Sequence, residues 1–161
     1  MQASPPSPSG QGPPPKAPLF NLERFVTAQA PVYDRVLAEL RSGRKRTHWM
    51  WFIFPQIAGL GSSSTSVHFA IQSLEEARAY LEHPVLGSRL VECAGTVLGL
   101  EGRTVSEVFP FPDDLKLRSS MTLFECAGGP GLVFSRVLDK YFGGSRDERT
   151  LELLNRGASR G

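Results

Sequence analysis

A dense group of aromatic and polar residues, T-H-W-M-W-F-I-F-P-Q, runs from Thr47 to Gln56, directly behind the basic run 44–46. Cationic side chains suit an anionic ligand, and an indole offers a flat face on which a base can stack. The Gln56 amide carries a donor and an acceptor, which suits the edge of a base or ribose. The alternative is that the basic run is a solvated connector and the aromatic residues form core. The candidate ligand-binding residues of this segment are His48, Trp49, Trp51 and Gln56.

A glycine- and serine-rich stretch, A-G-L-G-S-S-S-T-S, follows from Ala58 to Ser66. Glycines let the backbone approach a ligand closely, and successive N–H groups with hydroxyls can hold a phosphate. The stretch is no P-loop, because no Gly-Lys-Ser/Thr end and no preceding strand are present. We take Gly59 and Gly61 as candidate ligand-contacting positions, with a plain flexible linker as the alternative.

Two carboxylates, two cations and three hydroxyls lie close together in the segment P-D-D-L-K-L-R-S-S-M-T-L-F, residues 112–124. A carboxylate at a helix start, flanked by cations, stays ionised. Such a group can activate water or stabilise an oxocarbenium-like centre, as glycoside cleavage requires. The alternative is a row of surface ion pairs or a structural network. The candidate catalytic residues are Asp113 and Asp114, and the candidate ligand-binding residues are Lys116, Arg118, Ser119, Ser120 and Thr122.

The elements that must position these residues are predicted to be helices. Apolar residues recur at helical spacing between Leu22 and Leu40, with a break expected at Pro31. Capping boxes are indicated at Ser73 and Thr104, each followed three residues later by glutamate. No strand pair joined by a two-residue turn is apparent, and the aromatic block is bulky on both faces. The sequence predicts an all-α fold, a compact single-domain bundle of about six to eight helices.

Composition sets the domain limits and excludes several classes of protein. Seven of the thirteen prolines lie in residues 1–18, which predicts a disordered arm before a helical domain at 19–155 and a disordered tail at 156–161. A net charge of +2 does not indicate nucleic-acid binding. No apolar run suits a membrane span or a signal peptide, and we expect a cytoplasmic protein. The two cysteines and three histidines lack zinc spacing, so no metal or cofactor is expected.

Several motifs resemble a known family. They are F-x-L-x-R-F-V-x-A-Q, R-K-R-x-H-W-M-W-F-I-F-P-Q-x-A-G-L-G-x-S, E-A-R-A-Y-L-x-H-P-V-L-G-x-R-L and D-D-L-K-L-R-S-S-M-T-L-F. Over residues 20–154 the chain resembles an uncharacterised, mostly bacterial domain family whose members often carry the label "calpastatin". This resemblance implies a compact all-helical domain and no established activity.

A fainter similarity points to the NADAR family of ADP-ribose-associated helical glycohydrolases. Residues 86–100, Glu107 and Asp113 or Asp114 would occupy that family's leucine-rich helix and acidic positions. The tryptophan-glycine pair expected after the acidic residue is replaced by Lys-Leu-Arg at 116–118. The similarity implies an ADP-ribose-like class of ligand.

Two functions follow from these observations. In the first, a recessed site between the three segments binds a nucleotide or ADP-ribose-like molecule, and an N-glycosidic bond is a candidate substrate. In the second, the chain is a non-catalytic protein-interaction module with structural polar networks, and its proline-rich arm meets a partner protein. The two differ in whether the three segments converge on one polar-lined pocket.

Overall fold

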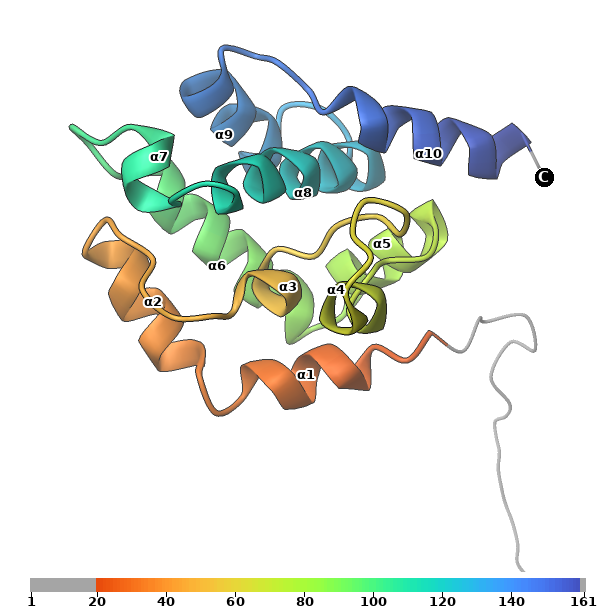
Figure 1. Cartoon of the computed structure of the whole chain (residues 1–161), viewed down its shortest axis with the longest axis horizontal. Coiled ribbons are helices and arrows are strands. Elements are labelled where there is room, and N and C mark those ends of the chain that lie inside the picture. Colours follow the sequence, from red (N-terminus) through yellow and green to blue (C-terminus); the bar gives the residue numbers. More distant parts are fainter. Residues whose placement is uncertain (1–19, 160–161) are drawn as a thin grey trace, which may run out of the picture.

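The computed structural model describes residues 20 to 159, and over this range the chain is all-helical (Figure 1). The helices are α1 (Glu23–Gln29), α2 (Tyr33–Arg41), α3 (Met50–Ile53), α4 (Ser64–His68), α5 (Leu74–Glu82), α6 (Leu86–Leu98), α7 (Val105–Val108), α8 (Asp113–Gly128), α9 (Val133–Phe142) and α10 (Glu148–Ser159). Within these residues the backbone forms no sheet, and a single isolated bridge joins Ile57 to Ile71. The all-α prediction is confirmed.

The expected number of six to eight helices is slightly low, since the described residues form ten. The difference comes from single-turn helices that periodicity cannot detect. The aromatic block forms α3, and the serine-rich stretch forms α4, in which the Ser63 hydroxyl caps the helix by accepting from the Ser66 N–H. α10 also continues to Ser159, beyond the domain end expected at residue 155. The proposed arm, residues 1–18, lies outside the described residues, as do the last two residues of the tail.

Local signals account for most helix boundaries. Pro31 separates α1 from α2, as expected from its position in the apolar pattern. The capping box at Thr104 is complete, because its hydroxyl accepts from the Glu107 N–H while the Glu107 carboxylate accepts from the Thr104 N–H. At Ser73 only half of the box forms. Its hydroxyl caps α5, but the Glu76 carboxylate accepts from the N–H of Gln72 instead.

Helix α8 lies at the centre of the molecule and packs against α5, α7, α9 and α10 (Figure 1). Its residues 119–124 are all buried, so it carries polar groups into the core. Helix α6 packs against α2, α5 and α9. Burial of apolar side chains from all these helices in one cluster is the main source of stability.

Side chains of α9 donate hydrogen bonds to the free carbonyl groups at the C-terminal end of α6. The ammonium group of Lys140 donates to the carbonyl oxygens of Leu98, at 2.6 Å, and Leu100. The Tyr141 hydroxyl donates to the carbonyl of Val97 at 2.6 Å. These contacts satisfy carbonyl groups that a helix end leaves without partners.

The described residues contain neither a helix suited to a membrane nor a cluster suited to a metal ion. Between residues 20 and 159, no helix has both the length and the apolar composition needed to cross a membrane. In the same range, no three His, Cys, Asp or Glu side chains gather as a metal site would require.

Cys93 and Cys126 are free thiols, and burial raises the pKa of Cys93 to about 12, which keeps it protonated at neutral pH.

Candidate functional site

A buried carboxylate, Glu39 on α2, organises the basic-aromatic block. It accepts hydrogen bonds from the backbone N–H groups of Arg46, at 2.7 Å, and Thr47, at 3.1 Å. It also accepts from the Thr47 hydroxyl at 2.7 Å and from the Trp49 indole N–H at 2.9 Å. Burial alone would raise the pKa of Glu39, but these donors outweigh burial and lower it to about 2. The segment that follows α2 is therefore folded around the ionised carboxylate of Glu39.

The two tryptophans have different surroundings. Trp49 is 1% exposed and packs against the rings of Phe54 and Phe109 in the core. Trp51 is half-buried, and the ammonium nitrogen of Lys116 lies 5.1 Å from the centre of its ring. Of the two, Trp51 is the one that borders a cavity.

The carboxylates proposed for catalysis lie at the start of α8. Asp113 is 2.8 Å from the ammonium nitrogen of Lys45 and 3.7 Å from that of Lys116. Lys45 itself lies over the Trp49 ring, so Asp113 joins two lysine–tryptophan pairs. Asp114 accepts from the N–H of Leu115 at 2.8 Å. Both carboxylates belong to the local structure of the α8 start, and neither lines the cavity beside Trp51.

The segment from Gln56 to Gln72 forms a closed loop. The N–H of Ala58 donates to the carbonyl of Ile71, and the N–H of Ile71 donates to that of Gln56, both at 2.8 Å. Gly59 has a φ of +106°, and a Cβ at this residue would lie 3.2 Å from the Leu153 side chain of α10. A Cβ at Gly61 would lie 2.7 Å from the Ser66 side chain. The loop is therefore compact, with short side chains where its two limbs approach.

The loop borders a partly open cavity of about 130 Å³, which we call the loop cavity. Its lining comprises Trp51, Gln56, Ile57, Ala58, Gly59, Gly61, Ser66, Val67, Phe69, Ala70 and Gln72. None of these side chains carries a charge, and the polar groups are two amides and one hydroxyl. A space lined by two aromatic side chains, Trp51 and Phe69, and by a few amide groups suits a flat, uncharged ring.

An ion pair between α1 and α5 holds the base of the loop. The Arg24 guanidinium donates to the carbonyls of His68 and Ala70, each at 2.8 Å, and lies 3.0 Å from a Glu76 carboxylate oxygen. The other oxygen of Glu76 accepts from the N–H of Gln72 at 2.8 Å. Both side chains are nearly buried, at 10% and 2% exposed. Sequence reasoning did not select this pair, since neither residue lies in the three conspicuous segments.

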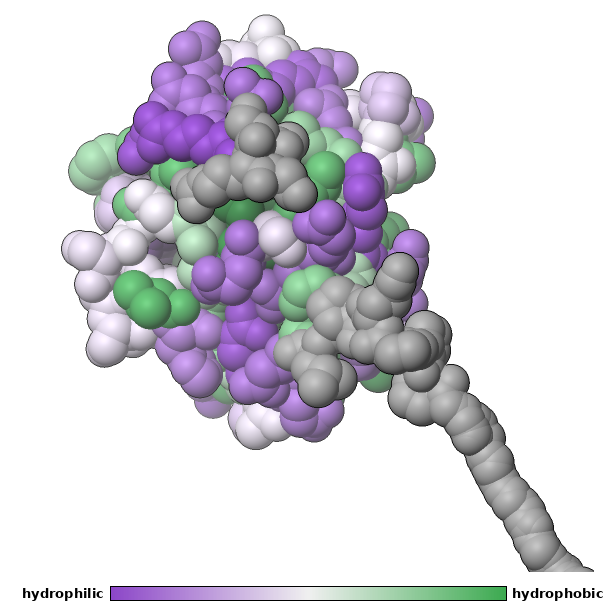
Figure 2. Space-filling view, turned by 90° about the vertical axis from the view of Figure 1, so that its right-hand side faces the viewer, coloured by the Kyte–Doolittle hydropathy of each residue, from purple (hydrophilic) through white to green (hydrophobic). Residues whose placement is uncertain are grey.

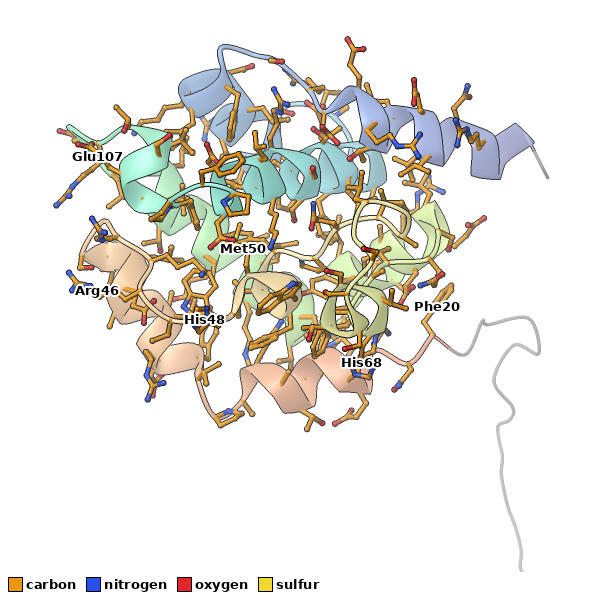
Figure 3. All side chains as sticks on the ribbon, viewed as in Figure 1. Phe20, Arg46, His48, Met50, His68 and Glu107 are labelled. Atoms are coloured by element: carbon orange, nitrogen blue, oxygen red, sulfur yellow. The ribbon has the colours of Figure 1, made fainter. Side chains whose placement is uncertain are left out.

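The histidines and the basic run contribute no side chain to the lining of the loop cavity. Figure 3 shows Arg46 and His48 on the connection between α2 and α3, while His68 lies on α4 beside Phe20. His48 is exposed. Neither Arg46 nor His48 lines the loop cavity.

Comparison with known proteins places the chain in a family. Residues 19–154 match the family described as "Protein of unknown function (DUF1810)". The chain belongs to this family. A crystal structure of the conserved hypothetical protein Rv1873 from Mycobacterium tuberculosis is similar to the DUF1810 chain, with 58% sequence identity and a TM-score of 0.83. The match covers 84% of this chain and 97% of that one. No match was found among curated protein sequences.

The second half of the α8 polar row serves the packing of the DUF1810 domain. The hydroxyl of Ser119 donates to Asp147 at 3.2 Å, and the Thr122 hydroxyl accepts from the Asp147 N–H at 3.0 Å. Arg118 lies 3.9 Å from the same carboxylate. Asp147 in turn caps α10 by accepting from the N–H of Thr150. These residues therefore fix α10 onto α8.

Ser120 is fully buried, and its hydroxyl has no hydrogen-bond partner among the described residues. Lys116 is the predicted member of the row that lies beside Trp51. Of the thirteen residues selected by type from the sequence, the loop cavity brings four together, namely Trp51, Gln56, Gly59 and Gly61.

Proposed function

We propose that the protein binds a nucleotide or ADP-ribose-like molecule, and that the loop cavity receives its base. The observation that carries the proposal is the half-buried Trp51 ring, which forms one wall of a cavity whose lining is otherwise small, apolar or amide-bearing. A base stacked on an aromatic side chain gains about 1–3 kcal/mol. Gln56 and Gln72 supply donors and acceptors for the edge of a base.

The proposal is limited to binding. Cleavage of an N-glycosidic bond requires a carboxylate at the bond itself, where the base joins the sugar. Among the described residues, no carboxylate lines the loop cavity, and Asp113 is held between two lysines. Hydrolysis is therefore a separate question, answered by whether free base appears when the protein is incubated with nucleosides or with ADP-ribose.

Isothermal titration calorimetry with adenine, guanine, uracil and nicotinamide tests the proposal. We expect one of these rings to bind, and Trp51→Leu to weaken that binding roughly tenfold or more, with the fold retained. Phe111→Leu is the matched control, because Phe111 is 75% exposed and lies outside the cavity lining. Failure of all four rings to bind, or equal affinities for Trp51→Leu and the wild type, would rule the proposal out.

A second candidate function, a protein-interaction module, is favoured by one observation. Phe111 is 75% exposed and Leu115 is 43% exposed, and both lie at the corner between α7 and α8. Exposed aromatic side chains of this kind are typical of protein-binding surfaces. Under this function Phe111→Leu would abolish capture of a partner, while Trp51→Leu would leave it unchanged.

A further inference from the structure

A second, larger cavity adjoins the loop cavity. It has a volume of about 450 Å³ and lies between the start of α5 and the C-terminal half of α10. We call it the α10 cavity, and its lining comprises Ile57, Ala58, Gln72, Ser73, Leu74, Glu75, Leu153, Leu154, Arg156 and Gly157. Three of these residues, Ile57, Ala58 and Gln72, also line the loop cavity. The two cavities therefore share part of their lining, at the two limbs of the closed loop.

Gln72, which lines both cavities, is anchored through its backbone. The N–H of Gln72 donates to Glu76, which is paired with Arg24, and the Gln72 amide donates to the carbonyl of Ala70 at 3.3 Å. The Gln72 side chain is exposed. A ligand that fills the loop cavity and extends past Gln72 enters the α10 cavity.

The α10 cavity differs from the loop cavity in its charged groups. Glu75 and Arg156 both line it and both are exposed, and among the described residues neither forms an ion pair. A carboxylate accepts hydrogen bonds from sugar hydroxyls, and a guanidinium binds phosphate. Figure 2 views the side of the molecule where α10 ends and α1 begins, and its surface mixes hydrophilic residues with small hydrophobic areas.

We infer that the α10 cavity holds the ribose phosphate of the nucleotide whose base occupies the loop cavity. Glu75 accepts hydrogen bonds from the ribose hydroxyls, and Arg156 binds the phosphate. This inference rests on the proposed function and adds the direction in which the ligand leaves the loop cavity. It names a ribosyl phosphate as the second part of the ligand.

The test compares three forms of the base that binds best: the free base, its nucleoside and its nucleoside 5′-monophosphate. For the wild type we expect the affinity to rise roughly three- to tenfold at each step, as one added hydrogen bond or charge contact predicts. Glu75→Gln should remove the gain from base to nucleoside. Arg156→Gln should remove the gain from nucleoside to monophosphate and leave nucleoside affinity unchanged. Arg149→Gln is the control, because Arg149 is an exposed arginine of α10 outside the cavity lining.

The outcomes separate the two proposals. If the base binds in a Trp51-dependent way but the nucleoside and monophosphate bind no more tightly, the inference is overturned and the proposed function stands. Equal effects of Arg156→Gln and Arg149→Gln would also overturn it, since bulk charge alone would then explain the phosphate gain. If no base binds at all, both proposals fail.

Discussion

Replacing Glu39 by glutamine tests whether one buried carboxylate organises the aromatic block. Glu39 is 7% exposed, and its carboxylate accepts four hydrogen bonds from Arg46, Thr47 and Trp49. Glutamine keeps the shape and one acceptor oxygen but removes the charge and turns an NH₂ group toward the Thr47 hydroxyl. The fall of the pKa from 4.5 to about 2 corresponds to about 3 kcal/mol of stability that depends on ionisation. We expect Glu39→Gln to lower the free energy of unfolding at pH 7 by about this amount.

The pH dependence makes this prediction specific. Because folding lowers the pKa of Glu39, its contribution is complete above the unfolded value of 4.5 and is lost as the pH falls toward about 2. Urea denaturation followed by circular dichroism should give a constant difference between wild type and Glu39→Gln above about pH 5 and a shrinking difference below it.

Glu82→Gln is the control for the Glu39 substitution, because Glu82 is exposed at the end of α5. It should change the stability by less than about 0.5 kcal/mol. A Glu39→Gln loss that matches the Glu82→Gln loss, or that does not vary with pH, would refute the reasoning.

Two further predictions concern the loop and α10. Gly61→Ala should weaken nucleoside binding, measured by calorimetry, with little change in melting temperature, because the new Cβ would displace Ser66 at an exposed part of the loop. The control is Gly95→Ala, whose new Cβ meets no atom within 4 Å, and this variant should bind the nucleoside as the wild type does. Equal affinities of the two variants would contradict the prediction. Asp147→Ala should destabilise the protein by about 1–2 kcal/mol through loss of the α10 cap, and amide hydrogen exchange should accelerate in α10 before α8; uniform acceleration would show that Asp147 does not act on α10 in particular.

The sequence predicts the helical fold well where the signals are local. The break at Pro31 and the cap at Thr104 each depend on a few neighbouring residues, and the structure contains both. The single turns α3 and α4 could not be predicted in this way, because four or five residues are too few to show a helical period. Their formation depends on packing and on the closed loop.

The candidate site was less accessible to sequence reasoning. Arg118, Ser119 and Thr122 look the same in sequence whether they face a ligand or a helix cap, and their partner Asp147 lies 25 or more residues away. Glu39 left one usable signal, a carboxylate on the buried face of α2 between Val36 and Leu40. The placement of Gln72 in the lining of both cavities has no sequence signal at all.

The stabilisation of the α6 end by α9 has a consequence for the order in which the chain can fold during synthesis. Lys140 is 42 residues beyond Leu98, so the carbonyl groups at the end of α6 gain this hydrogen-bond donor only after a distant part of the chain has been made. Glu39 and Trp49 are only 10 residues apart, and their contact can close soon after both are made. A ribosome-bound chain that stops before Lys140 would therefore already contain the Glu39–Trp49 contact, while the carbonyl groups at the end of α6 would still be hydrogen-bonded to water.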